Sequence, residues 1–572
     1  MKAAFLDKTY NVEFWDGESL GKVIAVDTET TMVPFTETPD LVTFQAFDGA
    51  RLFYVRRKDV RKFLGLHGGS HLVFHNAPFD VDVICKHLGE KDFFDYWIQL
   101  NQLWDTALLY RLLGLATRGH VPHKYNLALV TKELFGEELN KDEEIRENYE
   151  QYRESSLEQI PDHFLAYGAR DVLATFSVFH SLRSQISGTG STTQLSHQIQ
   201  IAGSIALNRI YKNGIGFDLD KAANILDGIN KELRLQRDIL ALYGWSRGFK
   251  GSKDAYERVV GEHLSLPLPR TEDGSVSSKA EDLIPFRNHQ FVDSYLKFID
   301  LEKQSTFIRD LNNEKIHPRY NVLVNTGRTS CSKPNFQQLP REGEIRNCFV
   351  SSPGTTFIIT DYAALELASL AQVTYSRYGH SKMRELINEG KDLHRYYASV
   401  LHEIPEEEVT KAQRQEAKAA NFGFPGGLGI ETFIKFSQGY GLDLSIDKAQ
   451  EMKDAWFLAF PEVKEYLNEQ EADESTWTLT GRKRANASYC ARKNTPFQGL
   501  AADGAKLALY NLDLQGFTLR GFVHDEIISE VDAASAEVLK NVQEKIMIES
   551  MNIVIPDVKI AVESQISNRY TK

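Results

Sequence analysis

The stretch Phe357-Ile-Ile-Thr-Asp361-Tyr362 is an apolar run that ends on a carboxylate. Further along the chain, Gly521-Phe-Val-His524-Asp525-Glu526-Ile-Ile has the same design. Each run predicts a buried strand with an acidic residue at its tip. Two strand-tip aspartates that meet can hold two Mg²⁺ ions, the usual arrangement for in-line phosphoryl transfer. The sequence therefore predicts a two-metal site built from Asp361 and Asp525.

Between these runs lies Arg414-Gln-Glu-Ala-Lys418-Ala-Ala-Asn-Phe422-Gly. Arg414, Lys418 and Phe422 recur every four residues, so in a helix they share one face. Arginine can fork onto a phosphate, and lysine is a compact positive charge. A metal pair beside such a helix is suited to binding a triphosphate. Taken alone, the segment could equally be an amphipathic surface helix with an isolated aromatic residue.

The composition is that of an ordinary globular protein, with 42% hydrophobic and 25% charged residues. A length of 572 residues predicts roughly three or four domains. The N-terminus lacks the apolar core of a signal peptide, and no apolar run could span a membrane. We therefore expect a cytoplasmic protein that does not bind membranes, in the host cytoplasm if a bacteriophage encodes it. The net charge of −13 argues only weakly against nucleic acid, because lysine and arginine gather near the predicted chemistry.

The N-terminal part contains three further acidic motifs. Ile24-Ala-Val-Asp27-Thr-Glu29 places two acids on one face of a strand, because side chains two apart point the same way. His75-Asn-Ala-Pro-Phe79-Asp80 follows an apolar strand and opens a predicted helix. In Tyr167-Gly-Ala-Arg-Asp171, the tyrosine and the aspartate lie one helical turn apart on one face. Any one of these motifs alone is a weak signal.

Together and in this order, the three motifs resemble those of the DnaQ-like 3′–5′ exonucleases of the tyrosine-containing type, over roughly residues 20–183. The resemblance implies an RNase H-like fold that acts on a single-stranded DNA 3′ end. It implies that Tyr167 orients the attacking water and that two metal ions are held by Asp27, Glu29, Asp80 and Asp171. Several carboxylates are needed to neutralise two dications. Trp104-Asp105-Thr106 also resembles a family segment, in which we expect Asp105 to be structural.

From about residue 200 nearly to the end, the chain resembles the family A DNA polymerases, such as the large fragment of bacterial DNA polymerase I and the bacteriophage replicative enzymes. The two acidic runs resemble the palm motifs, and the cationic helix resembles the fingers helix. The resemblance implies a mixed α/β, multidomain fold, with an RNase H-like exonuclease domain followed by a right-hand polymerase domain. The expected parts are the exonuclease domain (1–188), a mainly helical thumb region (189–320), the palm (321–374 and 486–572) and the fingers (375–485).

The resemblance also implies roles for the acidic residues of the palm. Asp361 and Asp525, with the carbonyl of Tyr362, would hold both Mg²⁺ ions, and Mn²⁺ could substitute. Glu526 would be a supporting acid.

The remaining implied roles concern the substrates. Arg414, Lys418 and His394 would bind the triphosphate, and Lys418 would also donate a proton to pyrophosphate. Phe422 would lie beside the nucleotide, and Glu366 has the place of the residue that excludes a ribose 2′-hydroxyl. The expected DNA contacts are Arg328, Asn335, Gln337, Asn494, Gln498, His524 and Arg482.

The chain departs from the family pattern after the fingers helix. Gly426-Gly427 stand where the family usually has Tyr-Gly, and Cys490 stands where an arginine is expected. Pro425 should push Phe424 toward extended geometry, which predicts a helix end near Gly423. One hypothesis is that Phe424 replaces the missing tyrosine as the residue that stacks on the template.

The predicted function is DNA synthesis from deoxynucleoside triphosphates on a primer–template, with proofreading, by a phage-type replicative enzyme without a 5′-nuclease domain. We expect a monomer, and accessory replication proteins are left open. A single-subunit RNA polymerase and a non-catalytic DNA-binding scaffold are the alternatives. Glu366 and the exonuclease motifs oppose the first, and the complete set of carboxylates opposes the second. A stand-alone exonuclease would leave two-thirds of the chain unexplained.

Overall fold

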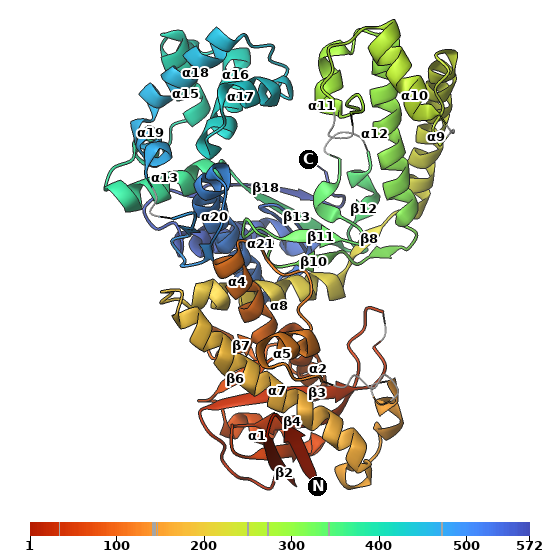
Figure 1. Cartoon of the computed structure of the whole chain (residues 1–572), viewed down its shortest axis with the longest axis vertical. Helices are drawn as coiled ribbons and strands as arrows, with labels where there is room; N and C mark the ends of the chain where they lie inside the picture. Colours follow the sequence, from red (N-terminus) through yellow and green to blue (C-terminus); the bar gives the residue numbers. More distant parts are fainter. Residues whose placement is uncertain are drawn as a thin grey trace.

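The computed structural model describes residues 1–33, 35–139, 145, 147–248, 251–270, 274–340, 344–470 and 473–571. The N-terminal domain lies at one end of the molecule, and two lobes rise from a central region at the other end (Figure 1). Within the described residues, no helix is both long enough and apolar enough to cross a membrane.

The N-terminal domain is built on a seven-stranded sheet with the order β1-β2-β5-β4-β3-β6-β7. The strand predicted around Asp27 is β3 (Val23–Thr30), which runs parallel to β6 and antiparallel to β4. The long helix α7 (Asp162–Ser187) crosses the sheet and packs on β3. The other strands are β1 (Lys2–Phe5), β2 (Lys8–Phe14), β4 (Leu41–Phe47), β5 (Leu52–Val55), β6 (His71–Phe74) and β7 (Leu103–Asp105). The other helices are α1 (Val60–Leu66), α2 (Ala77–Leu88), α3 (Asp95–Gln99), α4 (Thr106–Arg118) and α5 (Leu127–Phe135).

Helix α8 (His197–Asn213) joins the N-terminal domain to the rest of the molecule. The sequence placed this helix in the thumb region, but it packs against α20 (Tyr489–Leu514) beneath the central sheet. The side chains of α8 form hydrogen bonds with both the N-terminal domain and the C-terminal part of the chain. Toward the N-terminal domain, the bonds are from Asn208 to Asp82 (2.5 Å) and from the Asp105 N–H to His197 (3.1 Å). Toward the C-terminal part, the bonds are from Gln200 to Asp503 (3.0 Å) and from Asn213 to the Leu519 carbonyl (3.0 Å).

The central region contains a four-stranded antiparallel sheet with the order β16-β17-β13-β18. Both strands predicted from the acidic runs are present, because β13 (Thr355–Tyr362) carries Asp361 at its end and Asp525 follows β16. Helices α20 and α21 (Ala536–Asn552) pack on the sheet, and α13 (Leu365–Tyr378) packs on α20. The other strands are β16 (Thr518–Val523), β17 (Glu526–Asp532) and β18 (Val562–Ser567).

One of the two lobes consists mainly of the antiparallel pair α9 (Leu219–Leu242) and α12 (Gln290–Asp310). This lobe has its own hydrophobic core, which includes Trp245, Tyr256 and Phe298. Its other helices are α10 (Ser252–Glu257) and α11 (Ala280–Leu283). Short strands connect it to the central region: β8 (Ile215–Phe217), β9 (Lys315–Ile316), β10 (Arg319–Asn321), β11 (Ser330–Ser332) and β12 (Phe349–Val350).

The second lobe carries the predicted cationic helix, α16 (Lys411–Gly423). Thr410 and Gln413 form a capping box at its N-terminus, which satisfies backbone donors that would otherwise lack partners. The other helices of the lobe are α14 (Lys382–Asn388), α15 (Leu393–His402), α17 (Ile430–Gln438), α18 (Ile446–Ala459) and α19 (Pro461–Asn468). A two-stranded hairpin, β14 (Thr476–Trp477) and β15 (Lys483–Arg484), leads back to α20.

Helix α16 ends at Gly423 as predicted, but the expected conformation of Phe424 is wrong. Phe424 has helical dihedrals (φ −72°, ψ −31°) and begins a short 3₁₀ turn. Its side chain is fully buried, with its ring centroid 4.1 Å from that of Phe433 and 5.7 Å from that of Trp456. Burial of a large ring therefore outweighs the effect of the following proline. Phe424 is a core residue, and the hypothesis that it stacks on the template is also wrong.

Candidate active sites

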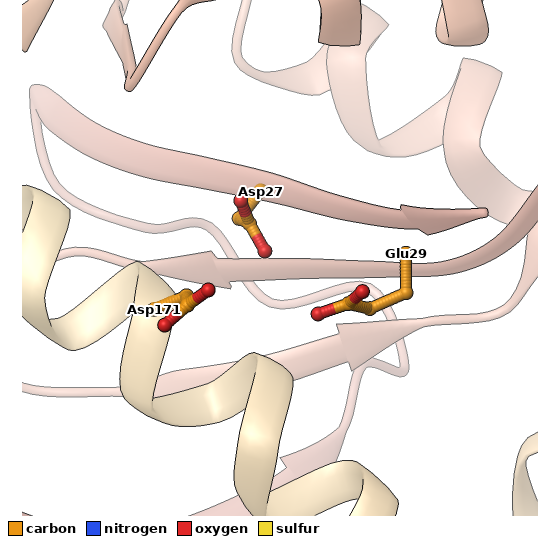
Figure 2. A group of neighbouring side chains, drawn as sticks. All are labelled: Asp27, Glu29 and Asp171. Atoms are coloured by element: carbon orange, nitrogen blue, oxygen red, sulfur yellow. The ribbon is translucent and has the colours of Figure 1, made fainter. Parts of the chain in front are cut away.

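Three carboxylates meet where α7 crosses β3 in the N-terminal domain. Asp27 and Glu29 lie on one face of the strand, and Asp171 approaches from the helix (Figure 2). One oxygen from each lies within 4.8 Å of the others. Hard oxygen ligands at this spacing suit Mg²⁺ or a similar divalent cation. The strand therefore places Asp27 and Glu29 on one face, and the helix places Asp171 opposite them, so that the three carboxylates meet.

The electrostatics of this cluster favour a bound cation. Burial raises the pKa of Asp27 well above its usual value, and the charges of Glu29, Asp80 and Asp171 raise it further. Crowded like charges in a buried place are costly unless a proton or a metal ion neutralises them. The donor set therefore fits a divalent metal ion.

Asp80 lies next to this cluster but is not among the three grouped carboxylates. Its Oδ1 accepts hydrogen bonds from the Thr28 hydroxyl (2.6 Å) and the Thr28 N–H (3.1 Å). Burial raises the pKa of Asp80 to about 7, although these hydrogen bonds act in the opposite direction. The sequence grouped all four carboxylates as metal ligands, whereas the structure turns Asp80 toward Thr28.

Two residues that support the cluster were missed in the sequence. Gln45, fully buried on β4, donates from its amide nitrogen to Asp27 Oδ2 (2.6 Å). Gly168 allows α7 to approach the sheet, since a Cβ there would lie 2.7 Å from the Gln45 amide nitrogen. Tyr167, one turn before Asp171, lines a small cavity of about 160 Å³ beside it.

Asp105 has the structural role expected of it. It caps the N-terminus of α4 by accepting from the N–H groups of Ala107 and Leu108, and it also accepts from those of Asn76 and Ala77. These bonds satisfy its buried carboxylate within the fold.

In the central sheet, Asp361 and Asp525 come together at one end of neighbouring strands. Asp361 is on β13, and Asp525 is in the turn between β16 and β17, which pairs with β13. Burial raises the pKa of Asp525 to about 7, and the charge of Asp361 is the next largest cause. Glu366 raises this pKa further, whereas Arg328 lowers it. The two strand-tip aspartates therefore lie at the same end of the sheet, near enough for the charge of one to raise the pKa of the other.

The residues that follow these two aspartates in the sequence, Glu526 and Tyr362, direct their side chains to other protein groups. Glu526 is 2% exposed and accepts a hydrogen bond from the Tyr570 hydroxyl (2.5 Å). The Tyr362 side chain is buried, and its hydroxyl donates to the Met547 carbonyl (2.7 Å). At both residues, the side chain is therefore engaged by protein groups.

The predicted triphosphate-binding residues lie together on α15 and α16. Arg414 Nε donates to Asp392 Oδ2 (2.6 Å), and Asp392 caps α15 just before His394. The His394 ring centroid is 5.6 Å from that of Phe422, which is 40% exposed. Burial lowers the pKa of His394 to about 4, with smaller contributions in the same direction from Arg414 and Lys418. The charge of Asp392 acts in the opposite direction but does not outweigh burial, so His394 is a neutral imidazole at pH 7.

Asn421, which is itself held by a hydrogen bond from Trp456, fixes the tautomer of the His394 imidazole. The Trp456 indole N–H, which can only donate, bonds to Asn421 Oδ1 (2.8 Å). The Asn421 amide nitrogen consequently faces His394 Nδ1, at 2.9 Å. Nδ1 is then the acceptor, so the ring proton lies on Nε2. The sequence reading assigned no role to Asn421 or Trp456.

Some of the predicted DNA contacts gather near the acidic pair. Arg328 forms an ion pair with Glu366, which joins two residues predicted for separate roles. Arg328, Gln337 and His524 line one small depression. Asn494 and Gln498 lie on consecutive turns of α20 and are hydrogen-bonded to each other (3.3 Å). In contrast, Asn335 lines a separate cavity at the base of the lobe formed by α9 and α12.

Arg482 does not fit its expected role as a DNA contact. Its side chain is 1% exposed, and Nη1 donates to both carboxylate oxygens of Asp503 (2.6 and 2.8 Å). Nη2 donates to the Gly499 carbonyl (3.0 Å). Lys506, also buried, donates to the carbonyl of Gly327 (2.6 Å) beside this pair. Arg482 is therefore part of a buried ionic network that supports the Gly327–Arg328 loop.

Comparison with known proteins identifies the families of the two parts of the chain. Residues 229–572 match the model of DNA polymerase family A, and residues 7–187 match a 3′–5′ exonuclease model. DNA polymerase I of Aquifex aeolicus is 27% identical over 90% of this chain and 89% of its own length. The thermostable DNA polymerase I of Thermus aquaticus is 28% identical over 65% of this chain and 48% of its own length.

A solved structure shares the fold. The POL domain of Pol1 from M. smegmatis, in complex with DNA primer–template and dNTP, has a TM-score of 0.75 at 20% identity. The similarity covers 98% of this chain and 99% of that one. The polymerase match covers more than half of the 572 residues and includes both aspartates of the acidic pair. This chain belongs to the family A DNA polymerases, and it also carries a 3′–5′ exonuclease domain.

Proposed function

We propose that the chain performs nucleotidyl transfer at a Mg²⁺ site formed by Asp361 and Asp525, and that it edits at a second Mg²⁺ site formed by Asp27, Glu29 and Asp171. As a family A DNA polymerase with an exonuclease domain, it extends primers on a DNA template and removes nucleotides from 3′ ends. Both domains belong to classes that use divalent metal ions. The observation that carries the polymerase assignment is the meeting of Asp361 and Asp525 at adjacent strand ends.

In the polymerase reaction, the primer 3′-oxygen forms a bond to the α-phosphorus of the nucleotide as the bond to the pyrophosphate oxygen breaks. Metal ions at Asp361 and Asp525 would stabilise the charge on the entering and leaving oxygens. Arg414 would hold the phosphates, and Lys418 would donate a proton to the departing pyrophosphate. His394, neutral and protonated on Nε2, would donate a hydrogen bond to a phosphate oxygen without adding a charge.

In the exonuclease reaction, a water oxygen forms a bond to the terminal phosphorus as the bond to the 3′-oxygen of the preceding nucleotide breaks. Asp27, Glu29 and Asp171 would hold the metal ions, and Tyr167 would orient the water. Asp80 would support the site from beside it, because its Oδ1 accepts both hydrogen bonds from Thr28.

We also propose how the parts of the chain divide the work. The pair α9 and α12 would be the thumb, the sheet with α13, α20 and α21 the palm, and α14–α19 the fingers. Arg328, Gln337 and His524 would contact the primer end, and Asn494 and Gln498 the adjacent base pair. The protein would act as a monomer.

The test separates the two sites with two variants and two substrates. Asp361→Ala should abolish primer extension and leave hydrolysis of single-stranded DNA intact. The double variant Asp27→Ala/Glu29→Ala should extend a paired primer normally but fail to remove a mismatched 3′ end. Loss of both activities in either variant, with the fold intact by circular dichroism, would contradict the assignment of two independent sites.

A further inference from the structure

The last residues of the chain lie against the palm. After β18 pairs with β13, Arg569 bridges to Val350, and the Tyr570 N–H donates to the Phe349 carbonyl (3.0 Å). Arg569 also forms an ion pair with Asp218 (2.8 Å), at the start of α9. The tail is therefore anchored along its length, and the Tyr570 side chain is fully buried.

The Tyr570 hydroxyl connects two charged groups. It accepts a hydrogen bond from Arg346 Nη1 (2.9 Å) and donates one to Glu526 Oε1 (2.5 Å). Because a guanidinium can only donate, the hydroxyl proton must point to the carboxylate. Arg346 is itself fixed, since it donates to the carbonyls of Pro340 (2.9 Å) and Leu339 (3.2 Å).

Two neighbours also hold the ring of Tyr570 in place. The Arg346 guanidinium lies 4.9 Å from the ring centroid, and the Phe336 ring is stacked at 5.9 Å with an interplanar angle of 21°. The hydroxyl is consequently presented to Glu526 with little freedom to move. Burial and the charge of Glu526 raise the pKa of Tyr570, so it remains a donor at neutral pH.

Glu526 directly follows Asp525, at the point where the turn enters β17. The turn is strained, because His524 has φ +62°, a conformation that residues other than glycine rarely adopt. A fixed carboxylate on the next residue limits how far this turn can relax. A buried carboxylate also needs hydrogen bonds to offset the cost of removing it from water.

We propose that Tyr570 is a positioning residue of the polymerase site, whose hydroxyl fixes Glu526 and thereby the turn that presents Asp525. This inference rests on the proposed role of Asp525.

The test removes a single oxygen atom, that of the Tyr570 hydroxyl. Tyr570→Phe keeps the ring, its stacking partner and the cation–π contact, but it leaves Glu526 without this donor. We expect the maximal rate of single-nucleotide incorporation to fall about tenfold. The Mg²⁺ concentration for half-maximal rate should rise, because Asp525 is less well placed. The KM for the nucleotide, the affinity for primer–template and hydrolysis of single-stranded DNA should each stay within twofold.

Tyr256→Phe is the matched control. It removes another buried hydroxyl, which donates to the Ser277 carbonyl (2.6 Å) in the lobe formed by α9 and α12. This variant should incorporate nucleotides at the wild-type rate. An equal fall in both variants would overturn the inference, and so would a wild-type rate and metal requirement in Tyr570→Phe.

A double-variant cycle separates this inference from the assignment of the site. If Tyr570 acts through Glu526, then adding Tyr570→Phe to Glu526→Gln should cause no further loss. Fully additive losses would refute the route through Glu526. The variant Asp525→Asn tests the proposed site independently of Tyr570. Primer extension that survives this change would refute the site itself.

Discussion

Replacing Gly168 with alanine should disable editing without touching the polymerase site. Gly168 lies on α7 between Tyr167 and Asp171, on the part of the helix that packs against Gln45 and Tyr54 of the sheet. An added Cβ would lie 2.7 Å from the Gln45 amide nitrogen and 2.9 Å from the Tyr54 hydroxyl. Neither neighbour is free to yield, because Gln45 donates to Asp27 (2.6 Å) and Tyr54 donates to the Leu165 carbonyl (2.6 Å).

The size of the effect follows from the overlap. Ordinary contact begins at 3.4 Å, so the helix or Gln45 must move by about 0.7 Å. Either movement separates Asp171 from Asp27 or removes the support of Asp27. A displacement of this size should lower the exonuclease rate about 10- to 100-fold. Overpacking costs about 1–3 kcal/mol and the helix propensity of alanine offsets about 1 kcal/mol, so stability should fall by about 0–2 kcal/mol.

The assay is the rate of 3′ degradation of a single-stranded oligonucleotide, with primer extension by the same preparation as the internal reference. Gly65→Ala is the matched control, because Gly65 lies in α1 of the same domain and an added Cβ there meets nothing within 4 Å. This control should keep both activities. Wild-type degradation by Gly168→Ala would refute the close-packing argument, and an equal loss in Gly65→Ala would show that helical glycines matter for another reason.

Three further changes have expected outcomes. Phe422→Tyr should relax discrimination against dideoxynucleotides by restoring a hydroxyl beside the sugar, and equal chain termination in both proteins would contradict this. The raised pKa values of Asp525 and Asp80, both about 7, mean that the metal-free protein loses stability as pH rises from about 4 to 7, since ionisation is disfavoured in the fold. Added Mg²⁺ should therefore raise the melting temperature more at pH 8 than at pH 5, and a pH-independent increment would refute this account. Arg482→Met should destabilise the fold by about 3–5 kcal/mol, because it takes the nearer cation away from the buried carboxylate of Asp503 and leaves Lys506 at 3.9 Å, and a wild-type denaturation curve would exclude that role.

The acidic residues could be predicted from the sequence because local periodicity controls them. A strand places residues two apart on one face, and an apolar run identifies a buried strand, so Asp27, Glu29, Asp361 and Asp525 were all found. The spacing of four residues placed Arg414 and Phe422 on one helical face. These features need no knowledge of distant partners.

Features that depend on distant partners could not be predicted in this way. Arg482 looks like a surface cation in sequence, and only the fold brings Asp503 opposite it. Asn421 and Trp456 fix the tautomer of His394 through contacts between three helices. Phe424 follows a helix and precedes a proline, yet its burial against Phe433 decides its conformation.

The two-sided bonding of α8 has a consequence for how errors are corrected. Because Asn208 and His197 bind one domain while Gln200 and Asn213 bind the other, the helix ties the exonuclease domain to the polymerase part of the chain. With the two sites as proposed, a wrongly paired end would have to melt from its template to reach the exonuclease domain, so the ease of strand separation at the terminus would govern how often it is trimmed.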